Sequence, residues 1–321
     1  MTKRIDGVGH TDFRNDGLET LLDFIRWGAK LFTEAGLVFG HGTDNAFDEA
    51  IVMTCQKLLL PVERLEHYMN AKLTFSERSA LTELYKQRIE TRQPAAYLTG
   101  QARFAGLDFY VNQHTLVPRS PIAELIERGF QGWLEPEQVT RVLDLCTGSG
   151  CIGIASLQAF DNAQVDLVDI SPQALDVAQK NIHRYSLEGQ ARAIKSDLFS
   201  ALNGERYDVI LSNPPYVDAI EMAALPPEYQ AEPALGLAAG DDGLDLVRRI
   251  LAEAANYLTP DGVLIVEVGV SQHFVEQVYE ELPLYWFEFT QGGEGVFAIS
   301  REELEMFDDL VQDRLSVLSN A

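Results

Sequence analysis

From residue 141 onward, short apolar runs alternate with longer segments whose apolar residues recur at helical spacing. Such patterns predict β-strands and amphipathic helices, respectively. Helices are expected near residues 151–160, 172–186, 242–258 and 271–281. Seven strands are expected near residues 142–145, 164–169, 192–195, 207–212, 263–267, 285–290 and 295–300. This alternation is typical of a mostly parallel sheet, and the glycine-rich segment 292–295 favours an antiparallel pair at its end.

The N-terminal part of the chain has helical periodicity and lacks this alternation. Four helices are expected there, near residues 18–35, 46–59, 62–70 and 74–91. Gly36 ends the first helix, and the segment Thr74-Phe75-Ser76-Glu77 has the spacing of a capping box at the start of the last.

The change of pattern predicts the domain organisation. Two short strands, at 104–111 and 115–117, are expected to pair as a hairpin around Asn112-Gln113-His114. We therefore predict a flexible tail (1–17), a helical domain (18–102), a β-hairpin linker (103–118) and an α/β domain (119–321).

Acidic residues dominate the charged positions. The 321 residues include 49 Asp and Glu against 25 Lys and Arg, which gives a formal net charge of −24. This balance argues against a nucleic-acid-binding surface, because phosphates are neutralised by clustered cations. It is compatible with a basic protein partner, or with solubility alone.

Membrane and metal sites are not expected. No apolar run approaches the roughly 18 residues of a membrane span, and Met1–Asp6 lacks an apolar signal region, so we expect a cytoplasmic protein. Cys55, Cys146 and Cys151 are too few for a disulfide framework. None of the six histidines has ligand spacing with another, so we expect no metal.

The segment Asn213-Pro214-Pro215-Tyr216 follows the strand expected at 207–212. Ligands bind at the carboxyl ends of strands in open α/β sheets. The two prolines fix φ and remove two amide donors, which leaves the Asn213 and Pro214 carbonyls free to point outward. An amide side chain, a backbone carbonyl and the Tyr216 ring form a clamp that suits a planar –NH2 group. A proline-stopped strand with a surface turn is the structural alternative.

A glycine turn follows the strand expected at 142–145. It includes Thr147, Gly148, Gly150 and Gly153, and glycines allow backbone amides to approach a ligand closely. The spacing G-x-G-x-x-G also occurs in dinucleotide-binding proteins. Asp144 favours a different ligand, because its carboxylate would repel a pyrophosphate and attract a sulfonium with its amino group.

Two further acids end the next two strands. Asp169 stands about 20 residues past the glycines, where it is placed to accept both hydroxyls of a ribose, although it is also positioned to cap the helix at Pro172. Asp197 is placed to accept an adenine amino group while Leu198 packs on the ring. This series predicts an adenosine with a positive tail, beside an amine-type acceptor at Asn213.

With these motifs the chain resembles the protein N(5)-glutamine methyltransferases from about residue 20 to the end. The glycine turn and Asn-Pro-Pro-Tyr are shared by the whole family. Within it, the chain is most similar to the branch that acts on the large-subunit ribosomal protein L-three. Three segments carry that similarity: Gly40-His41-Gly42-Thr43-Asp44-Asn45, Leu116-Val117-Pro118-Arg119-Ser120-Pro121-Ile122 and Gly292-Gly293-Glu294-Gly295-Val296-Phe297. Leu198 departs from the aromatic residue that release-factor enzymes can carry beside the adenine.

The resemblance implies a Rossmann-like methyltransferase fold, in which the helical domain recognises the substrate. It implies S-adenosylmethionine as cofactor and S-adenosylhomocysteine as product. It also implies that Asn213 and the Pro214 carbonyl hold a glutamine amide, while Pro215 and Tyr216 complete the acceptor site.

Three other functions remain open. The substrate can be a peptide chain release factor, and enzymes that methylate adenine N-6 in nucleic acid share Asn-Pro-Pro-Tyr. A silent assembly factor that binds the cofactor is the third. The net charge speaks against nucleic acid as the direct substrate.

The segment 217–247 is acidic and contains no Lys or Arg. A basic ribosomal protein is the expected partner, and an acidic rim around the acceptor clamp is expected to steer it. The acids are Asp218, Glu221, Glu228, Glu232, Asp241, Asp242 and Asp245.

Overall fold

A computed structural model describes residues 13–319, which divide into two compact units. The first, called the helical unit, contains the described residues up to Gln101 together with Pro226–Ala231. The second, called the sheet unit, contains Ala102–Leu225 and the chain from Glu232 onward. Residues 1–12 of the expected flexible tail lie outside the described part of the chain.

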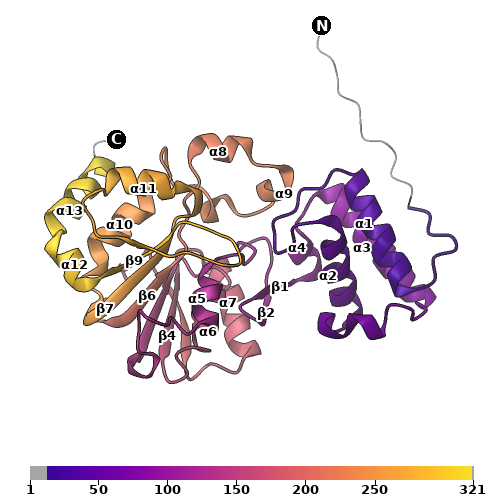
Figure 1. The fold of residues 1–321 in the computed structure, drawn as a ribbon, viewed down its shortest axis with the longest axis horizontal. Helices are drawn as coiled ribbons and strands as arrows, with labels where there is room; N and C mark the ends of the chain where they lie inside the picture. The colour runs from indigo at the N-terminus through magenta and orange to yellow at the C-terminus, as the bar shows by residue number, and fades with distance from the viewer. Residues whose placement is uncertain (1–12, 320–321) are drawn as a thin grey trace, which may run out of the picture. The chain divides into compact units, whose positions relative to one another are not determined.

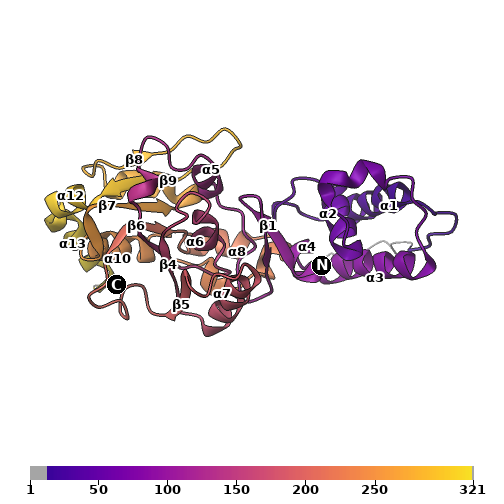
Figure 2. The ribbon, with the colours of Figure 1, turned by 90° about the horizontal axis from the view of Figure 1, so that it is seen from below.

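Three helices with side-chain caps make up most of the helical unit (Figure 2). Thr20 and Thr74 each form a capping box at their helix, and Asn45 accepts two backbone hydrogen bonds at its own. Their core contains a cluster of aromatic rings around Tyr85. The elements are α1 (Leu21–Glu34), α2 (Ala46–Leu58), the 3-10 helix η1 (Val62–His67), α3 (Phe75–Thr91), α4 (Ala95–Thr99) and α9 (Pro227–Gln230).

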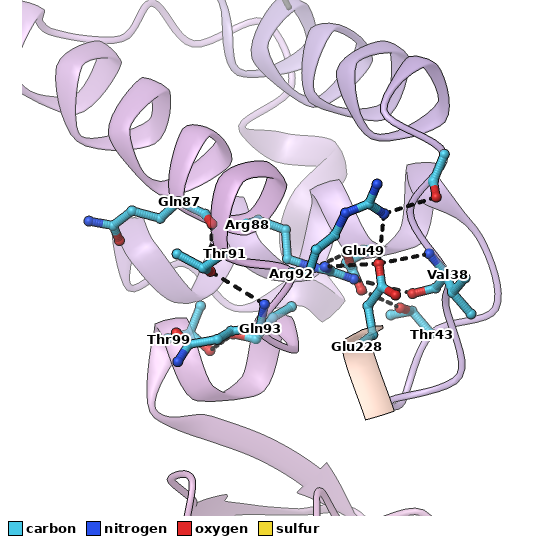
Figure 3. A network of polar contacts seen from close by, with 12 residues as sticks. Val38, Thr43, Glu49, Gln87, Arg88, Thr91, Arg92, Gln93, Thr99 and Glu228 are labelled. Atoms are coloured by element: carbon cyan, nitrogen blue, oxygen red, sulfur yellow. Dashed lines mark hydrogen bonds and ion pairs between the residues drawn. The ribbon is translucent and has the colours of Figure 1, made fainter. Parts of the chain in front are cut away.

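A buried ion-pair network ties α9 into the helical unit (Figure 3). Glu228 is fully buried, lies 2.9 Å from Arg92 and accepts a 3.1 Å hydrogen bond from the Val38 amide. Arg88 is also fully buried, donates to Glu49 at 2.9 Å and lies 3.8 Å from Glu228. The segment Pro226–Ala231, far away in sequence, therefore supplies a carboxylate that balances the buried arginine charges of this network.

The sheet unit is built on seven strands in the order β5-β4-β3-β6-β7-β9-β8. The first five in this order pair in parallel, and β9 is antiparallel to both β7 and β8. This confirms the expected α/β fold with a mostly parallel sheet and an antiparallel end. The strands are β3 (Arg141–Leu145), β4 (Gln164–Asp169), β5 (Ala191–Lys195), β6 (Tyr207–Ser212), β7 (Leu258–Glu267), β8 (Tyr285–Trp286) and β9 (Val296–Ser300).

Helices cover both faces of this sheet, each over its own apolar core (Figure 1). Alternate residues of the strands enter the two cores, as the period of a pleated strand requires. One face carries α5 (Ile122–Glu127), α6 (Cys151–Ser156) and α7 (Pro172–Arg184), and the other α10 (Asp245–Ala254), α11 (Gln272–Val278), α12 (Arg301–Met306) and α13 (Asp308–Ser316). Among the described helices, none has the length and apolar character that crossing a bilayer would need.

The hairpin lies earlier in the chain than the sequence pattern predicts. Its strands are β1 (Gln101–Phe104) and β2 (Leu107–Tyr110), and residues 115–117 form no strand. The turn is Ala105-Gly106, where both residues have positive φ (45° and 77°). A two-residue turn of this kind matches the twist of paired strands, so the chain folds back between Phe104 and Leu107.

Candidate active site

A cavity of about 290 Å³ opens at the carboxyl ends of β3, β4, β5 and β6 in the sheet unit. We call it the strand-end cavity. The register of the parallel strands aligns Leu145 with Ser212, so that the residues following these strands meet at one edge. Its walls include Cys146, Gly148, Asp169, Asp197, Leu198, Asn213, Pro215, Pro233, Leu235 and Arg249.

The glycine turn after β3 is held by hydrogen bonds to the buried carboxylate of Asp144. Asp144 is fully buried, and its Oδ2 accepts hydrogen bonds from the Thr147 hydroxyl (2.5 Å) and the Gly153 amide (2.8 Å). A Cβ on Gly153 would come within 2.3 Å of the Leu167 side chain, so this position requires glycine. Asp144 therefore holds Thr147 and Gly153 together, while Gly148 lines the cavity.

Burial raises the pKa of Asp144 to about 7. Its Oδ1 is buried and has no hydrogen-bond partner among the described residues. An unpartnered buried carboxylate oxygen is costly, which makes this atom a natural acceptor for a donor that a ligand or a water supplies.

Asp169 ends β4 and lines the strand-end cavity. One carboxylate oxygen accepts from the Gly148 amide at 2.9 Å, and the other accepts from the Ser171 amide at 2.8 Å. Burial raises its pKa. Ser171, rather than Asp169, is the N-cap of α7, since its hydroxyl accepts from the Ala174 amide. Each Asp169 oxygen keeps a lone pair for a further donor.

Asp197 and Leu198 follow β5, and both line the cavity. Asp197 also pairs with Arg249 of α10 at 2.9 Å, and this arginine is a wall residue that the sequence did not single out. Leu198 is 5% exposed and has a φ of 45°, an uncommon conformation for a leucine. The strained backbone turns this apolar side chain into the cavity wall.

The segment Asn213–Tyr216 follows β6 and is held on several sides. Asn213 and Pro215 line the cavity, and the Tyr216 carbonyl accepts from the Ser271 hydroxyl at 2.7 Å. A Cβ on Gly269 would come within 2.8 Å of the Tyr216 ring, so the ring packs directly on that glycine. The motif is thus clamped between β6 and the loop that follows β7.

Glu267, the last residue of β7, contacts this motif and was not singled out from the sequence. It is 4% exposed, and its carboxylate accepts a hydrogen bond from the Tyr216 hydroxyl at 3.4 Å. The Asn213 side-chain amide also acts on this carboxylate as a donor that lowers its pKa. The Ser120 hydroxyl donates to the other carboxylate oxygen. The sequence does contain a signal for it, because Glu267 ends an apolar strand just as Asp169 does.

Of the eleven site residues named from the sequence, the cavity wall contains Gly148, Asp169, Asp197, Leu198, Asn213 and Pro215. Two others, Asp144 and Thr147, are buried and hydrogen-bonded to each other, and Gly150 is the N-cap of α6. Pro214 is buried and Tyr216 half-buried. In the described part of the chain, no group of three His, Cys, Asp or Glu residues is arranged to hold a metal.

The acidic segment 217–247 is less charged than its sequence suggests. Glu228 is buried in the helical unit, where it pairs with Arg92. Glu232 accepts both ends of the Arg119 guanidinium, at 2.8 and 2.7 Å. Asp242 pairs with Arg248. The expectation that all seven acids form a rim is therefore wrong for these three, because arginines from other segments neutralise them.

Comparisons with known proteins agree with this geometry. Residues 131–225 match the family model described as "Methyltransferase small domain". The chain is 50% identical over 289 residues to a ribosomal protein uL3 glutamine methyltransferase of Xanthomonas campestris pv. campestris, covering 90% of this chain and 94% of the relative. It is 45% identical over 288 residues to a protein of the same name from Bordetella pertussis, covering 89% and 97%.

Among solved structures, the chain is similar to the 16S rRNA N2 G1207 methyltransferase of T. thermophilus in complex with AdoMet and guanosine. The sequence identity is 21% and the TM-score 0.43, over 62% of this chain and 49% of that chain.

Proposed function

Because the chain belongs to the family of ribosomal protein uL3 glutamine methyltransferases, we propose that it transfers a methyl group from S-adenosylmethionine to a glutamine side chain of ribosomal protein uL3, the large-subunit protein L-three. One observation carries the proposal: Asn213 lines the same cavity as Asp169 and Asp197. A cofactor site and an acceptor site thereby share one space.

The wall residues fit S-adenosylmethionine, which when bound supplies an electrophilic methyl group on a sulfonium. Asp169 would hold the ribose hydroxyls, because both of its oxygens already accept one backbone amide and retain a lone pair. Gly148 has open space where a Cβ would stand, which leaves room for a ligand against the turn. Asp197 and Leu198 would contact the adenine, and Asp144 would attract the cationic end from below the turn.

The acceptor chemistry follows from the motif after β6. An amide nitrogen is a weak nucleophile, because its lone pair is delocalised into the carbonyl. The Asn213 side-chain oxygen and the Pro214 carbonyl would accept the two N–H groups, push electron density back onto nitrogen and orient it toward the methyl group. Pro215 and Tyr216 would pack against the flat amide. We assign recognition of the rest of the protein substrate to the helical unit.

The test is methyl transfer from labelled cofactor to purified substrates. Ribosomal protein uL3 is expected to gain one methyl group on one glutamine, as located by mass spectrometry. A release factor, and DNA or RNA, are assayed in parallel under the same conditions. Labelling of the release factor or of adenine in place of uL3 would overturn the proposed substrate.

A further inference from the structure

Glu267 is a carboxylate at the point where the acceptor motif is anchored. In the sheet, Ser212 of β6 pairs with Val266 of β7, so the next residues of the two strands, Asn213 and Glu267, are neighbours at the carboxyl edge. Glu267 is 4% exposed, and the hydroxyls of Ser120 and Tyr216 donate hydrogen bonds to it. The charge of Arg119 and the Asn213 side-chain amide also act to lower its pKa. The nearby Arg119 forms a two-pronged ion pair with Glu232.

The orientation of Asn213 decides whether the motif can hold an amide. Its side chain has an NH2 end that donates and an oxygen that accepts, and the two ends differ little in shape. A substrate –NH2 group needs the oxygen end. An ionised carboxylate only accepts hydrogen bonds, so Glu267, as the neighbour of Asn213 at the strand ends, favours the NH2 end of Asn213 and leaves the oxygen for the cavity that Asn213 lines.

The same carboxylate also fixes the other end of the motif. The Tyr216 hydroxyl donates to Glu267 at 3.4 Å, while its ring lies against Gly269 and its carbonyl accepts from Ser271. All three partners come from the end of β7 and the loop after it. The buried carboxylate of Glu267 therefore positions both the Asn213 side chain and the Tyr216 ring.

We propose that Glu267 is a positioning residue for methyl transfer: as a carboxylate, it holds Asn213 with its side-chain oxygen facing the substrate amide and holds the Tyr216 ring beside it. This inference rests on the function proposed above, but the orientation of Asn213 can be measured without any substrate.

Protonation of Glu267 would undo this arrangement. A carboxylic acid carries a donor of its own, which would compete with the Asn213 NH2 group and favour a flipped amide. Burial raises the pKa of Glu267 to about 7. The charged or titratable groups around it are Arg119, Tyr216 and Glu232. Turnover is therefore expected to fall as the pH drops below about 7, because the active form is the carboxylate.

The Glu267→Gln variant tests the proposal, since it keeps the shape and replaces an acceptor-only group with one that donates. Turnover on uL3 is expected to fall about 100-fold, while calorimetric affinity for S-adenosylmethionine stays within a few-fold. The fall of turnover below pH 7 should disappear. The Glu267→Asp variant retains an acceptor-only group and should recover part of the lost turnover.

A double-mutant comparison separates positioning from general damage. If Glu267 acts through Asn213, then Glu267→Gln should cause little further loss in an Asn213→Ala background. Ser120→Ala serves as the matched control, since it removes one hydrogen bond to Glu267 but leaves the acceptor for Asn213. It should retain the acid limb of the pH profile and most of the turnover.

An NMR titration gives a readout independent of activity. In protein labelled with 15N-asparagine, the side-chain NH2 signals of Asn213 should titrate with a midpoint near 7 in the wild type and stay constant in Glu267→Gln. Equal turnover and an unchanged acid limb in Glu267→Gln, with wild-type transfer intact, would overturn the positioning role alone. Absence of transfer by the wild type, with the titration as expected, would overturn the proposed function alone.

Discussion

The helical unit and the sheet unit each bury a glutamate, but the two carboxyl groups have different partners. Glu228 of the helical unit lies among two arginines and a backbone amide (Figure 3). Glu267 of the sheet unit accepts hydrogen bonds from the hydroxyls of Ser120 and Tyr216. Both are less than 5% exposed, so burial alone does not distinguish them.

The pKa values of the two groups move in opposite directions. Burial acts to raise both, but for Glu228 the Val38 amide and Arg92 outweigh it and hold the pKa below its usual range. For Glu267, burial outweighs the Ser120 and Tyr216 hydroxyls and the more weakly acting Arg119, and the pKa rises to about 7. Glu228 is thus a permanent charge within an ion-pair network, whereas Glu267 titrates near neutrality. The comparison teaches that the partners of a buried acid, more than its burial, indicate whether it serves structure or chemistry.

The largest expected effect is on the chemical side of this comparison. Asn213→Ala removes the group that Glu267 is inferred to orient, and turnover should fall at least about 1000-fold, because orientation is worth several kcal/mol of barrier. Cofactor affinity should stay within a few-fold, and unfolding by urea should change little. Single-turnover kinetics beside calorimetry measure both quantities. Near-normal turnover would remove Asn213 from the mechanism.

In the helical unit, Glu228→Gln should lower the free energy of unfolding by about 3–5 kcal/mol, because it removes a carboxylate that balances the charges of Arg88 and Arg92. Arg88 is fully buried, so water cannot compensate. Urea denaturation measures the change, and Glu221→Gln, an exposed acid in the same acidic segment, is the matched control. A stability equal to that of the control would show that the network contributes nothing.

Glu267→Gln should behave in the opposite way. The pKa of Glu267 is about 7 in the folded protein against an ordinary value of 4.5, so folding favours the protonated form. That stabilisation is full below pH 4.5 and is lost as the pH rises through about 7. Glutamine does not ionise, so the variant should gain stability relative to the wild type between these pH values, by on the order of 3 kcal/mol at most. Urea unfolding at about pH 5 and about pH 8 measures the difference in free energy of unfolding between the variant and the wild type. A difference that narrows with rising pH would contradict the inferred ionisation.

Asp169→Ala should weaken S-adenosylmethionine binding by about 1.5–3 kcal/mol for each hydrogen bond to a ribose that is lost. Because Ser171 caps α7, removal of Asp169 leaves that helix its cap. Calorimetric titration gives the affinity, and Ser171→Ala is a control that removes the cap but leaves the carboxylate. Unchanged affinity in Asp169→Ala would show that this carboxylate only organises the turn.

The sequence predicted local features well and long-range pairing poorly. Most strands lie within a few residues of their predicted positions, because a buried parallel sheet requires apolar runs. The helices after β9 were missed, although Ser300 and Glu303 have capping-box spacing. The hairpin was misplaced, since the apolar residues at 104, 107, 109 and 111 were interpreted as one strand, whereas the turn at Ala105-Gly106 divides them between two.

The site was predictable to the extent that a residue and its role lie close in sequence. Asp169 ends β4, Asn213 directly follows β6, and both line the cavity. The pairing of Glu228 with Arg92 spans 136 positions, and no local pattern announces it. The same holds for Arg249, whose ion pair with Asp197 joins α10 to the end of β5. Ion pairs between residues far apart in sequence are therefore what the sequence pattern did not predict.

The smallest expected effect concerns acids of the segment 217–247 outside the ion pairs of Glu228, Glu232 and Asp242. Glu221 and Asp241 are exposed in the segment after the motif, and ribosomal proteins that bind RNA are basic. If these acids steer the substrate, kcat/KM on uL3 should fall as ionic strength rises, while kcat at saturation should barely change.

Neutralising both acids, as Glu221→Gln with Asp241→Asn, should lower kcat/KM by up to about tenfold at low salt and flatten its salt dependence. Glu135→Gln with Glu137→Gln makes the same change in charge at exposed sites before the amino end of β3, and should leave the salt dependence intact. A salt-independent kcat/KM in the unmodified protein would leave the acidic surface as a solubility trait, and equal flattening by both pairs would assign steering to net charge rather than to this segment.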